Sequence, residues 1–143
     1  MTLNELFWKT GKLSQKLFRF TETSLNDFAF ENCKKLKKVL IPSNSQLEIL
    51  GCKSFAYTKI ISFFIPSNVS SINYAFFNCD KLQIVEIAEN SKIGFIYADS
   101  FKYCGNIVLF VPCKSSNIVF NDTLPCSPFL KRNHAKTKLE LED

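Results

Sequence analysis

The stretch FENCKKLKKVLIP, from Phe30 to Pro42, is matched later in the chain by FFNCDKLQIVEIA, from Phe76 to Ala88. The two stretches start 46 residues apart and place Phe, Cys, Leu, Val and Ile at identical spacings. Self-similarity at a fixed period is the sequence signature of repeat proteins. The matching stretches therefore indicate a tandem array of short units.

The whole array can be followed from a Phe that comes directly after a small residue. This anchor recurs at intervals of 25, 21 and 25 residues, at Phe30, Phe55, Phe76 and Phe101. A small residue follows three positions later, at Cys33, Thr58, Cys79 and Cys104. A large aliphatic residue comes next, at Leu36, Ile60, Leu82 and Ile107. We therefore expect about four units of 21–25 residues.

Each unit also contains a short strand-like segment of alternating aliphatic residues. In the first unit Val39 and Ile41 are predicted to face one way, and Lys38 and Leu40 the other. One such strand cannot bury its apolar face alone, so the units are expected to stack with strands about 4.8 Å apart. Prolines should end the strands, at Pro42, Pro66 and Pro112. Ala88 replaces the expected proline and predicts a slightly longer strand.

The segment IPSNVSSINYAFFNCDKLQIVEIA, residues 65–88, resembles the BspA-like leucine-rich repeats. The resemblance extends over about residues 17 to 113 and rests on the joint spacing of Phe, Cys, Leu and Ile-Pro. It implies a leucine-rich-repeat solenoid, a right-handed coil that is rich in short strands and poor in helix. It also implies a surface or secreted protein of adhesion or surface-antigen type.

Three regions are expected along the chain. Residues 1–20 are predicted to form an N-terminal cap or a degenerate first repeat, with Trp8 in the core of the cap. Residues 21–113 form the repeat array, and residues 114–143 form a C-terminal cap and a flexible charged tail. Terminal units differ from the middle ones because they shield an otherwise open stack.

The charge of the chain is local. Of the net charge of +5, much comes from CKKLKKV, residues 33–39, and from the tail, residues 130–143. We interpret these runs as solvated surface. The anchor Phe residues fall in phase with the repeat, which favours a place in the core over a stacking platform for bases. We therefore expect no nucleic-acid partner.

Targeting signals are absent from the sequence. No stretch reaches the roughly 18 apolar residues that a membrane span needs, and the N-terminus lacks the basic start and apolar block of a signal peptide. We expect no membrane insertion. The resemblance favours the cell surface or secretion, with the cytoplasm as the alternative. Asn68 and Asn121 begin glycosylation triplets, which matter only in a secreted protein.

Six cysteines raise the question of disulfides or metal. No C-x-x-C pair occurs and the only His is His134, so we expect no metal site and no cofactor. Cys33, Cys79 and Cys104 share one position of the repeat, where a Cys is expected to be a small buried residue. Free core thiols are favoured, although Cys79 could bond to Cys104, and Cys113 to Cys126.

The sequence offers little for catalysis. There is no glycine-rich phosphate loop. No two of the candidate acidic residues form a paired catalytic motif, and these residues are Glu48, Asp80, Glu86, Asp99 and Asp122. A Cys–His pair would need His134 from the charged tail. We therefore expect a protein that is not an enzyme.

Binding is expected on the exposed side of the strands. In stacked-repeat proteins these positions line one continuous surface. The candidate residues form two columns, Lys38, Ser62 and Ile84, and Leu40, Phe64 and Glu86. Apolar side chains among charged neighbours are typical of a protein-interaction site. The alternative is that a C-terminal segment or a second copy of the chain covers them.

Two functions follow from these observations. The first is a non-catalytic protein-protein interaction module at the cell surface, of the adhesion or surface-antigen type. The second is an intracellular leucine-rich-repeat scaffold or regulatory module, which the missing leader and the free-thiol interpretation favour. Both require a protein partner, and self-association is an open alternative.

Overall fold

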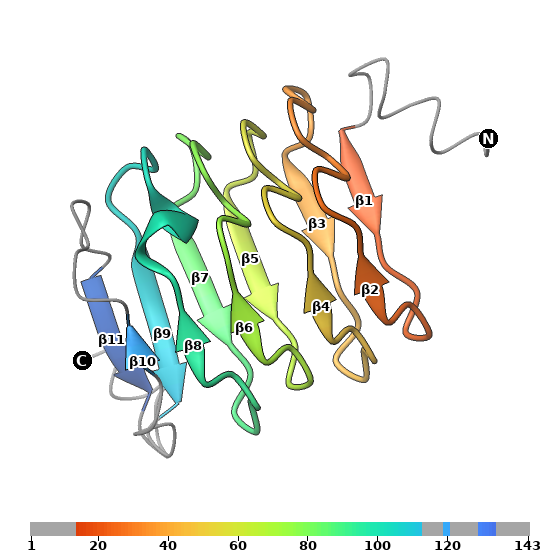
Figure 1. Ribbon diagram of the computed structural model, residues 1–143, viewed down its shortest axis with the longest axis vertical. Coiled ribbons are helices and arrows are strands. Elements are labelled where there is room, and N and C mark those ends of the chain that lie inside the picture. The colour runs from red at the N-terminus through yellow and green to blue at the C-terminus, as the bar shows by residue number, and fades with distance from the viewer. Residues whose placement is uncertain (1–13, 113–118, 121–128, 134–143) are drawn as a thin grey trace.

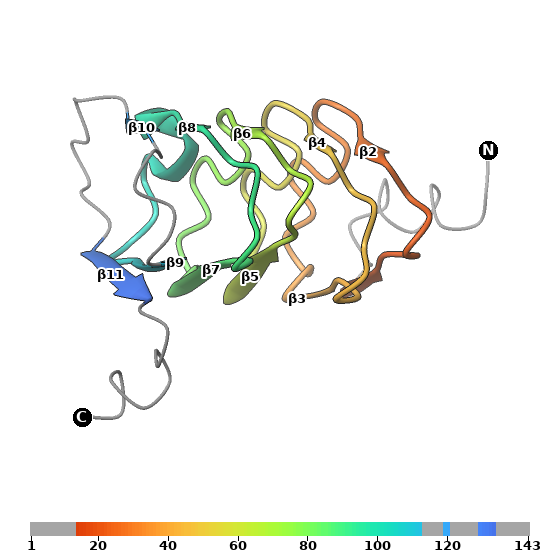
Figure 2. The same cartoon turned by 90° about the horizontal axis from the view of Figure 1, so that it is seen from below.

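A computed structural model describes residues 14–112, 119–120 and 129–133 (Figure 1). Each turn of the chain places a longer strand on one face and a two-residue strand on the opposite face (Figure 2). The longer strands are β1 (Gln15–Leu17), β3 (Lys38–Leu40), β5 (Ser62–Ile65), β7 (Ile84–Ile87), β9 (Val108–Pro112) and β11 (Phe129–Asn133). The shorter ones are β2 (Ser24–Leu25), β4 (Ile49–Leu50), β6 (Ser71–Ile72), β8 (Phe95–Ile96) and β10 (Val119–Phe120).

All the strand pairs are parallel, which is the arrangement of a solenoid. A single 3-10 helix, η1 (Ala98–Phe101), is the only helical element in the described part of the chain. The predicted leucine-rich-repeat solenoid, β-rich with little helix, is therefore confirmed.

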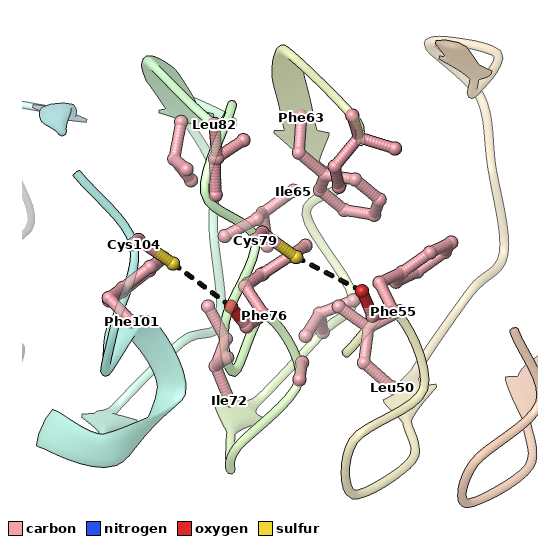
Figure 3. Packing of buried hydrophobic residues seen from close by; sticks show 14 of the residues in the cluster. Leu50, Phe55, Phe63, Ile65, Ile72, Phe76, Cys79, Leu82, Phe101 and Cys104 are labelled. Carbon is pink, nitrogen blue, oxygen red and sulfur yellow. Dashed lines mark hydrogen bonds between the residues drawn. The ribbon is translucent and has the colours of Figure 1, made fainter. Parts of the chain in front are cut away.

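The anchor Phe residues are superposed along the axis of the solenoid. Phe30 and Phe55 stack with ring centroids 5.4 Å apart, Phe55 and Phe76 at 6.0 Å, and Phe76 and Phe101 at 5.7 Å. Their ring planes differ by only 5° to 9°. All four are buried, and Figure 3 shows the last three within the core. The anchor residues, which recur with the repeat period, therefore form a column of stacked rings between the two faces of the solenoid.

The alternation predicted for the strands is present. Inward side chains of the longer strands are buried, at Phe63, Ile65, Val85, Ile87, Leu109 and Val111. Val39 and Ile41 pack against the same core but are only partly buried. Strand β5 ends just before Pro66, and β9 ends at Pro112. The longer strand predicted at Ala88 is wrong, because a turn closed by the Ser91 N–H on the Ala88 carbonyl begins there.

In the turns around each anchor Phe, residues other than glycine adopt the left-handed backbone conformation. Residues two positions before or after an anchor have φ between 54° and 64°, namely Phe28, Asn32, Lys53, Tyr57, Tyr74, Asn78 and Tyr103. Such a conformation costs roughly 1–2 kcal/mol per residue for a side chain with a Cβ. The regular recurrence explains how a chain with only 4 Gly makes tight turns. Packing of the buried anchors must offset this strain.

The hydrogen-bonded ladders are interrupted at one level of the solenoid. Strands β1 and β3 form one sheet and β5, β7, β9 and β11 another, while β2 and β4 are likewise separate from β6, β8 and β10. The gap between β3 and β5 is visible in Figure 1. The coil that follows it is short, since residues 66–70 join β5 to β6 where residues 41–48 join β3 to β4. The interruption therefore lies next to the shortest of the described connections between the two faces.

Other contacts hold the two halves together across this gap. The Phe55 N–H donates to the Ala75 carbonyl at 2.9 Å, and the Tyr57 N–H donates to the Phe77 carbonyl at 3.0 Å. The Phe55–Phe76 stack also crosses it. The core is therefore continuous although the sheets are not.

Two buried serines, Ser54 and Ser100, each come directly before an anchor Phe and differ in the hydrogen bonds of their hydroxyl groups. Ser54 is fully buried, and its hydroxyl has no hydrogen-bond partner in the described structure. Ser100 is equally buried, but its hydroxyl accepts from the Tyr74 N–H and donates to the Ile72 carbonyl, both at 3.0 Å. Ala occupies the same position in two other units, as Ala29 and Ala75.

We expect Ser54→Ala to leave stability unchanged or to raise it by up to about 1 kcal/mol, because an unsatisfied hydroxyl is removed. Ser100→Ala should lower stability by about 1–3 kcal/mol, because two backbone groups lose their partner. Urea unfolding of both variants, with unchanged m-values, provides the measurement. Equal losses in the two variants would contradict this interpretation.

Candidate protein-binding face

The exposed side of the longer strands places the candidate residues in two columns. Strand register sets Ser62 beside Ile84, which lies beside Val108, and sets Phe64 beside Glu86, which lies beside Phe110. In the N-terminal sheet Gln15 lies beside Lys38, and Leu17 beside Leu40. We call the outward side chains of β1, β3, β5, β7 and β9 the outer face.

The structure divides the six predicted residues between two sheets. Ser62, Phe64, Ile84 and Glu86 are direct neighbours on β5 and β7. Lys38 and Leu40 lie on β3, which is hydrogen-bonded to β1 and not to β5. The predicted columns are therefore interrupted between the first pair and the other four.

The outer face is largely apolar and open to solvent. Leu17 is 63% exposed and Ile84 is 42% exposed, while Leu40, Phe64 and Phe110 are half-buried. Lys38 and Glu86 are exposed and supply opposite charges. The surface thus combines apolar side chains with separated charges over five strands.

Sequence reasoning missed three apolar members of this face, namely Leu17, Val108 and Phe110. The signal for them was present, since KLFRF (residues 16–20) and VLFVP (residues 108–112) show the same alternation as the central strands. Leu17 fell in the region interpreted as a cap, and the shortened fourth unit obscured the alignment of Phe110.

The repeat position three residues after the anchor Phe, held by Cys or Thr, forms a hydrogen bond in addition to packing in the core. The Cys79 thiol donates to the Phe55 carbonyl and the Cys104 thiol donates to the Phe76 carbonyl, both at 3.0 Å (Figure 3). In the second unit the Thr58 hydroxyl donates to the Phe55 carbonyl at 2.8 Å. Each of these donors satisfies the carbonyl of an anchor residue. They are therefore more than the small apolar fillers that the sequence predicted.

The described cysteines are thiols rather than disulfides, so Cys79 and Cys104 are not bonded to each other. Burial raises the pKa of the Cys33 thiol to about 11, which disfavours the reactive thiolate at neutral pH. The predicted pair of Cys113 and Cys126 lies outside the described residues, as do Trp8, Asn121, Asp122 and His134.

Residues 3–124 match the family described as the BspA type leucine rich repeat region, in six copies. This chain belongs to that family. The six copies extend into the segments predicted as caps, and six longer strands are found in the described structure. No curated protein matches the chain in sequence.

Solved structures of three bacterial proteins share the fold of this BspA-type chain. The pneumococcal vaccine antigen PcpA is 21% identical with a TM-score of 0.70, and the match covers 87% of this chain and 31% of PcpA. A leucine rich cell surface protein from Faecalibacterium prausnitzii is 19% identical with a TM-score of 0.54, covering 91% and 41%. A leucine-rich repeat protein from Bacteroides ovatus is 20% identical with a TM-score of 0.52, covering 86% and 34%. This chain spans between about a third and two fifths of those proteins.

Two acidic residues of this BspA-type array, Asp80 and Asp99, make contacts between coils. Asp80 accepts two hydrogen bonds from the Lys59 ammonium, at 2.9 and 3.0 Å, and this contact lowers the pKa of the Asp80 carboxyl. Asp99 accepts from the Tyr74 hydroxyl at 2.9 Å, which raises the pKa of that phenol. Both contacts join neighbouring coils, so these side chains have structural partners.

The described residues contain neither a metal-binding cluster nor a membrane-spanning helix. No group of three or more His, Cys, Asp or Glu side chains lies close enough to hold a metal ion. No helix in the same residues has the length and apolar character of a membrane span.

Proposed function

We propose that this chain is a non-catalytic protein-protein interaction module that presents its outer face to a partner protein. The observation that carries the proposal is that apolar side chains on the outer side of two parallel sheets are exposed or half-buried, at Leu17, Leu40, Phe64, Ile84 and Phe110. Parallel sheets normally have both faces covered. Here the inner face packs on the anchor Phe column, and the outer face is left for a partner.

The finer role that we propose is adhesion at a cell surface. Two structural relatives are described as a vaccine antigen and as a cell surface protein, which supports this placement. Asn68, in the loop from β5 to β6, begins a glycosylation triplet and is half-buried. The reduced core thiols favour the second candidate, an intracellular scaffold. Glycosidase treatment and thiol titration of the natural protein would separate the two, since a glycan is expected only after secretion.

The interaction can be tested with the double variant Leu40→Glu and Phe64→Glu. Two charges on the outer face should reduce capture of the partner at least tenfold, because an apolar contact would have to bury unpaired carboxylates. The matched control is Ile49→Glu, since Ile49 is 58% exposed on β4, on the opposite face of the solenoid. Partners recovered by pull-down and mass spectrometry provide the measurement.

The control should retain full capture, and both proteins should keep the wild-type circular dichroism spectrum. Unchanged capture by the double variant would show that the outer face does not bind the partner. If instead a second copy covers the face, sedimentation of the wild-type protein will show a dimer that the double variant lacks.

A further inference from the structure

One level of the solenoid lacks backbone hydrogen bonds on three of its four sides. We call this level the seam; it separates the coil with β3 and β4 from the coil with β5 and β6, and both sheets stop there. The loop edge, on the lower side of Figure 1, joins each longer strand to the short strand that follows it. Among the described residues, no hydrogen bond joins residues 41–48 to residues 66–70 across this edge. On the two neighbouring levels the N–H groups of Gln46 and Lys92 donate across the same edge, at 2.8 and 2.7 Å.

The fourth side, which carries the anchor Phe residues, is bonded continuously. Its segment 51–61 runs from β4 to β5 and therefore crosses the seam as covalent chain. The N–H groups of Phe30 and Asn32 donate to carbonyls of this segment, at 2.8 and 2.9 Å. Within the segment, the N–H groups of Phe55 and Tyr57 donate to carbonyls of the next coil, at 2.9 and 3.0 Å. Backbone hydrogen bonds thus join the two halves of the solenoid along this anchor edge only.

Packing in the core is also looser beside the seam. The inward side chains of β3, Val39 and Ile41, are only partly buried, whereas those of β5, Phe63 and Ile65, are fully buried. Less buried apolar area means a smaller hydrophobic resistance to separation. Regions with few buried apolar contacts and unpaired backbone are those that open most readily. The strand side of the seam combines both features.

From these contacts we propose that the seam is a hinge. The halves 14–50 and 62–112 bend relative to each other about segment 51–61, and the loop edge opens and closes. Hinges are short segments at the ends of elements that absorb the change in backbone angles. Leu40 and Phe64 lie on opposite sides of the seam, so bending changes the curvature of the outer face between them. This property goes beyond the binding of a partner and does not depend on it.

Spin-label distances measure the bending. One pair of nitroxide labels replaces Thr21 and Asn90 on the loop edge, and the matched pair replaces Lys35 and Asn106 on the anchor edge. All four positions are exposed, and both pairs span the seam. Attachment through a ketone-bearing amino acid leaves the native cysteines unlabelled. Dipolar electron paramagnetic resonance should give a distance distribution at least about twice as wide for the loop-edge pair, because the hinge axis follows the anchor edge. Equal widths for the two pairs would overturn the proposal.

Amide hydrogen exchange of the unmodified protein locates the axis. The Lys59 N–H donates to the Leu36 carbonyl at 2.9 Å, where the anchor edge meets the open strand side, and the Gln83 N–H makes the corresponding bond one level further on, at 2.8 Å. We expect Lys59 to be protected at least about tenfold less than Gln83, and Phe55 to be protected as well as Phe76. Equal protection of Lys59 and Gln83 would contradict bending at the seam. Weaker protection of Phe55 than of Phe76 would mean that the halves separate completely, which would also overturn the hinge.

Discussion

Replacement of Phe76 by Ala is expected to lower the free energy of unfolding by about 3–5 kcal/mol. Phe76 is fully buried between the rings of Phe55, at 6.0 Å, and Phe101, at 5.7 Å. The ring of Phe63 packs against it edge to face, at 4.8 Å. The substitution therefore opens a cavity in the centre of the stack, where collapse from either side would break another ring contact. Urea unfolding gives the measurement.

The control for Phe76→Ala is Phe28→Ala. Phe28 is 53% exposed and already has a left-handed backbone, so the substitution removes little packing and leaves φ unchanged. A change of less than about 0.5 kcal/mol is expected for such a surface position. Similar losses for Phe76→Ala and Phe28→Ala would mean that the stacked column does not hold the units together.

Gly51→Ala is expected to destabilise the chain by about 3 kcal/mol or more, because overpacking against backbone cannot be relieved by rotation of a side chain. A Cβ at this position would lie 2.4 Å from the carbonyl carbon of Asn26 and from the nitrogen of Asp27. These atoms belong to the preceding coil, whose Leu25 carbonyl accepts from the Gly51 N–H at 2.8 Å. A Cβ would therefore force two neighbouring coils apart.

Gly94→Ala serves as the control for Gly51→Ala, because nothing lies within 4 Å of the corresponding Cβ. Its effect should be within about 0.5 kcal/mol of zero, or slightly stabilising through the reduced entropy of the unfolded chain. Thermal unfolding measures both, and the melting temperature of Gly51→Ala should fall by roughly 10 °C. A Gly51→Ala protein as stable as Gly94→Ala would disprove the close contact between coils.

The fold could be predicted from the sequence because one constraint acts on every unit. Each copy has an apolar face that only a neighbouring copy can cover, so the spacing of Phe30, Phe55, Phe76 and Phe101 translates directly into stacked rings. The inward and outward sides of β5 and β7 followed from the alternation of strand side chains. These features depend on residue type and spacing alone.

Other features depend on how neighbouring coils meet, which residue types do not encode. The interval of 21 residues between Phe55 and Phe76 was visible in the sequence, but the interruption of both sheets between β3 and β5 was not. A Cys at the inward position signals burial. Whether its thiol reaches an anchor carbonyl depends on the backbone of the coil before it. The left-handed turns at Tyr57 and Asn78 gave no glycine signal, because non-glycine residues adopt them here.

The candidate binding face was predicted only in part, because the alternation of side chains gives the side of a strand but not the strand that lies next to it. The alternation placed Phe64 and Glu86 on one side of the strands, and the structure sets them side by side. Leu40 lies across the interruption, on a sheet that pairs with β1. Leu17 and Phe110 lie in segments with the same alternation, and the register of the end strands sets Leu17 beside Leu40 and Phe110 beside Glu86.

Ring-to-ring contacts between successive anchors test the stacking of units most directly. Nuclear Overhauser effects can be measured on protein with labelled Phe rings, assigned by single replacements of the anchors by Leu. We predict effects for the pairs Phe30–Phe55, Phe55–Phe76 and Phe76–Phe101, and none between Phe30 and Phe76 or between Phe55 and Phe101. Missing effects between successive anchors in a folded protein would contradict the solenoid and the outer face that depends on it.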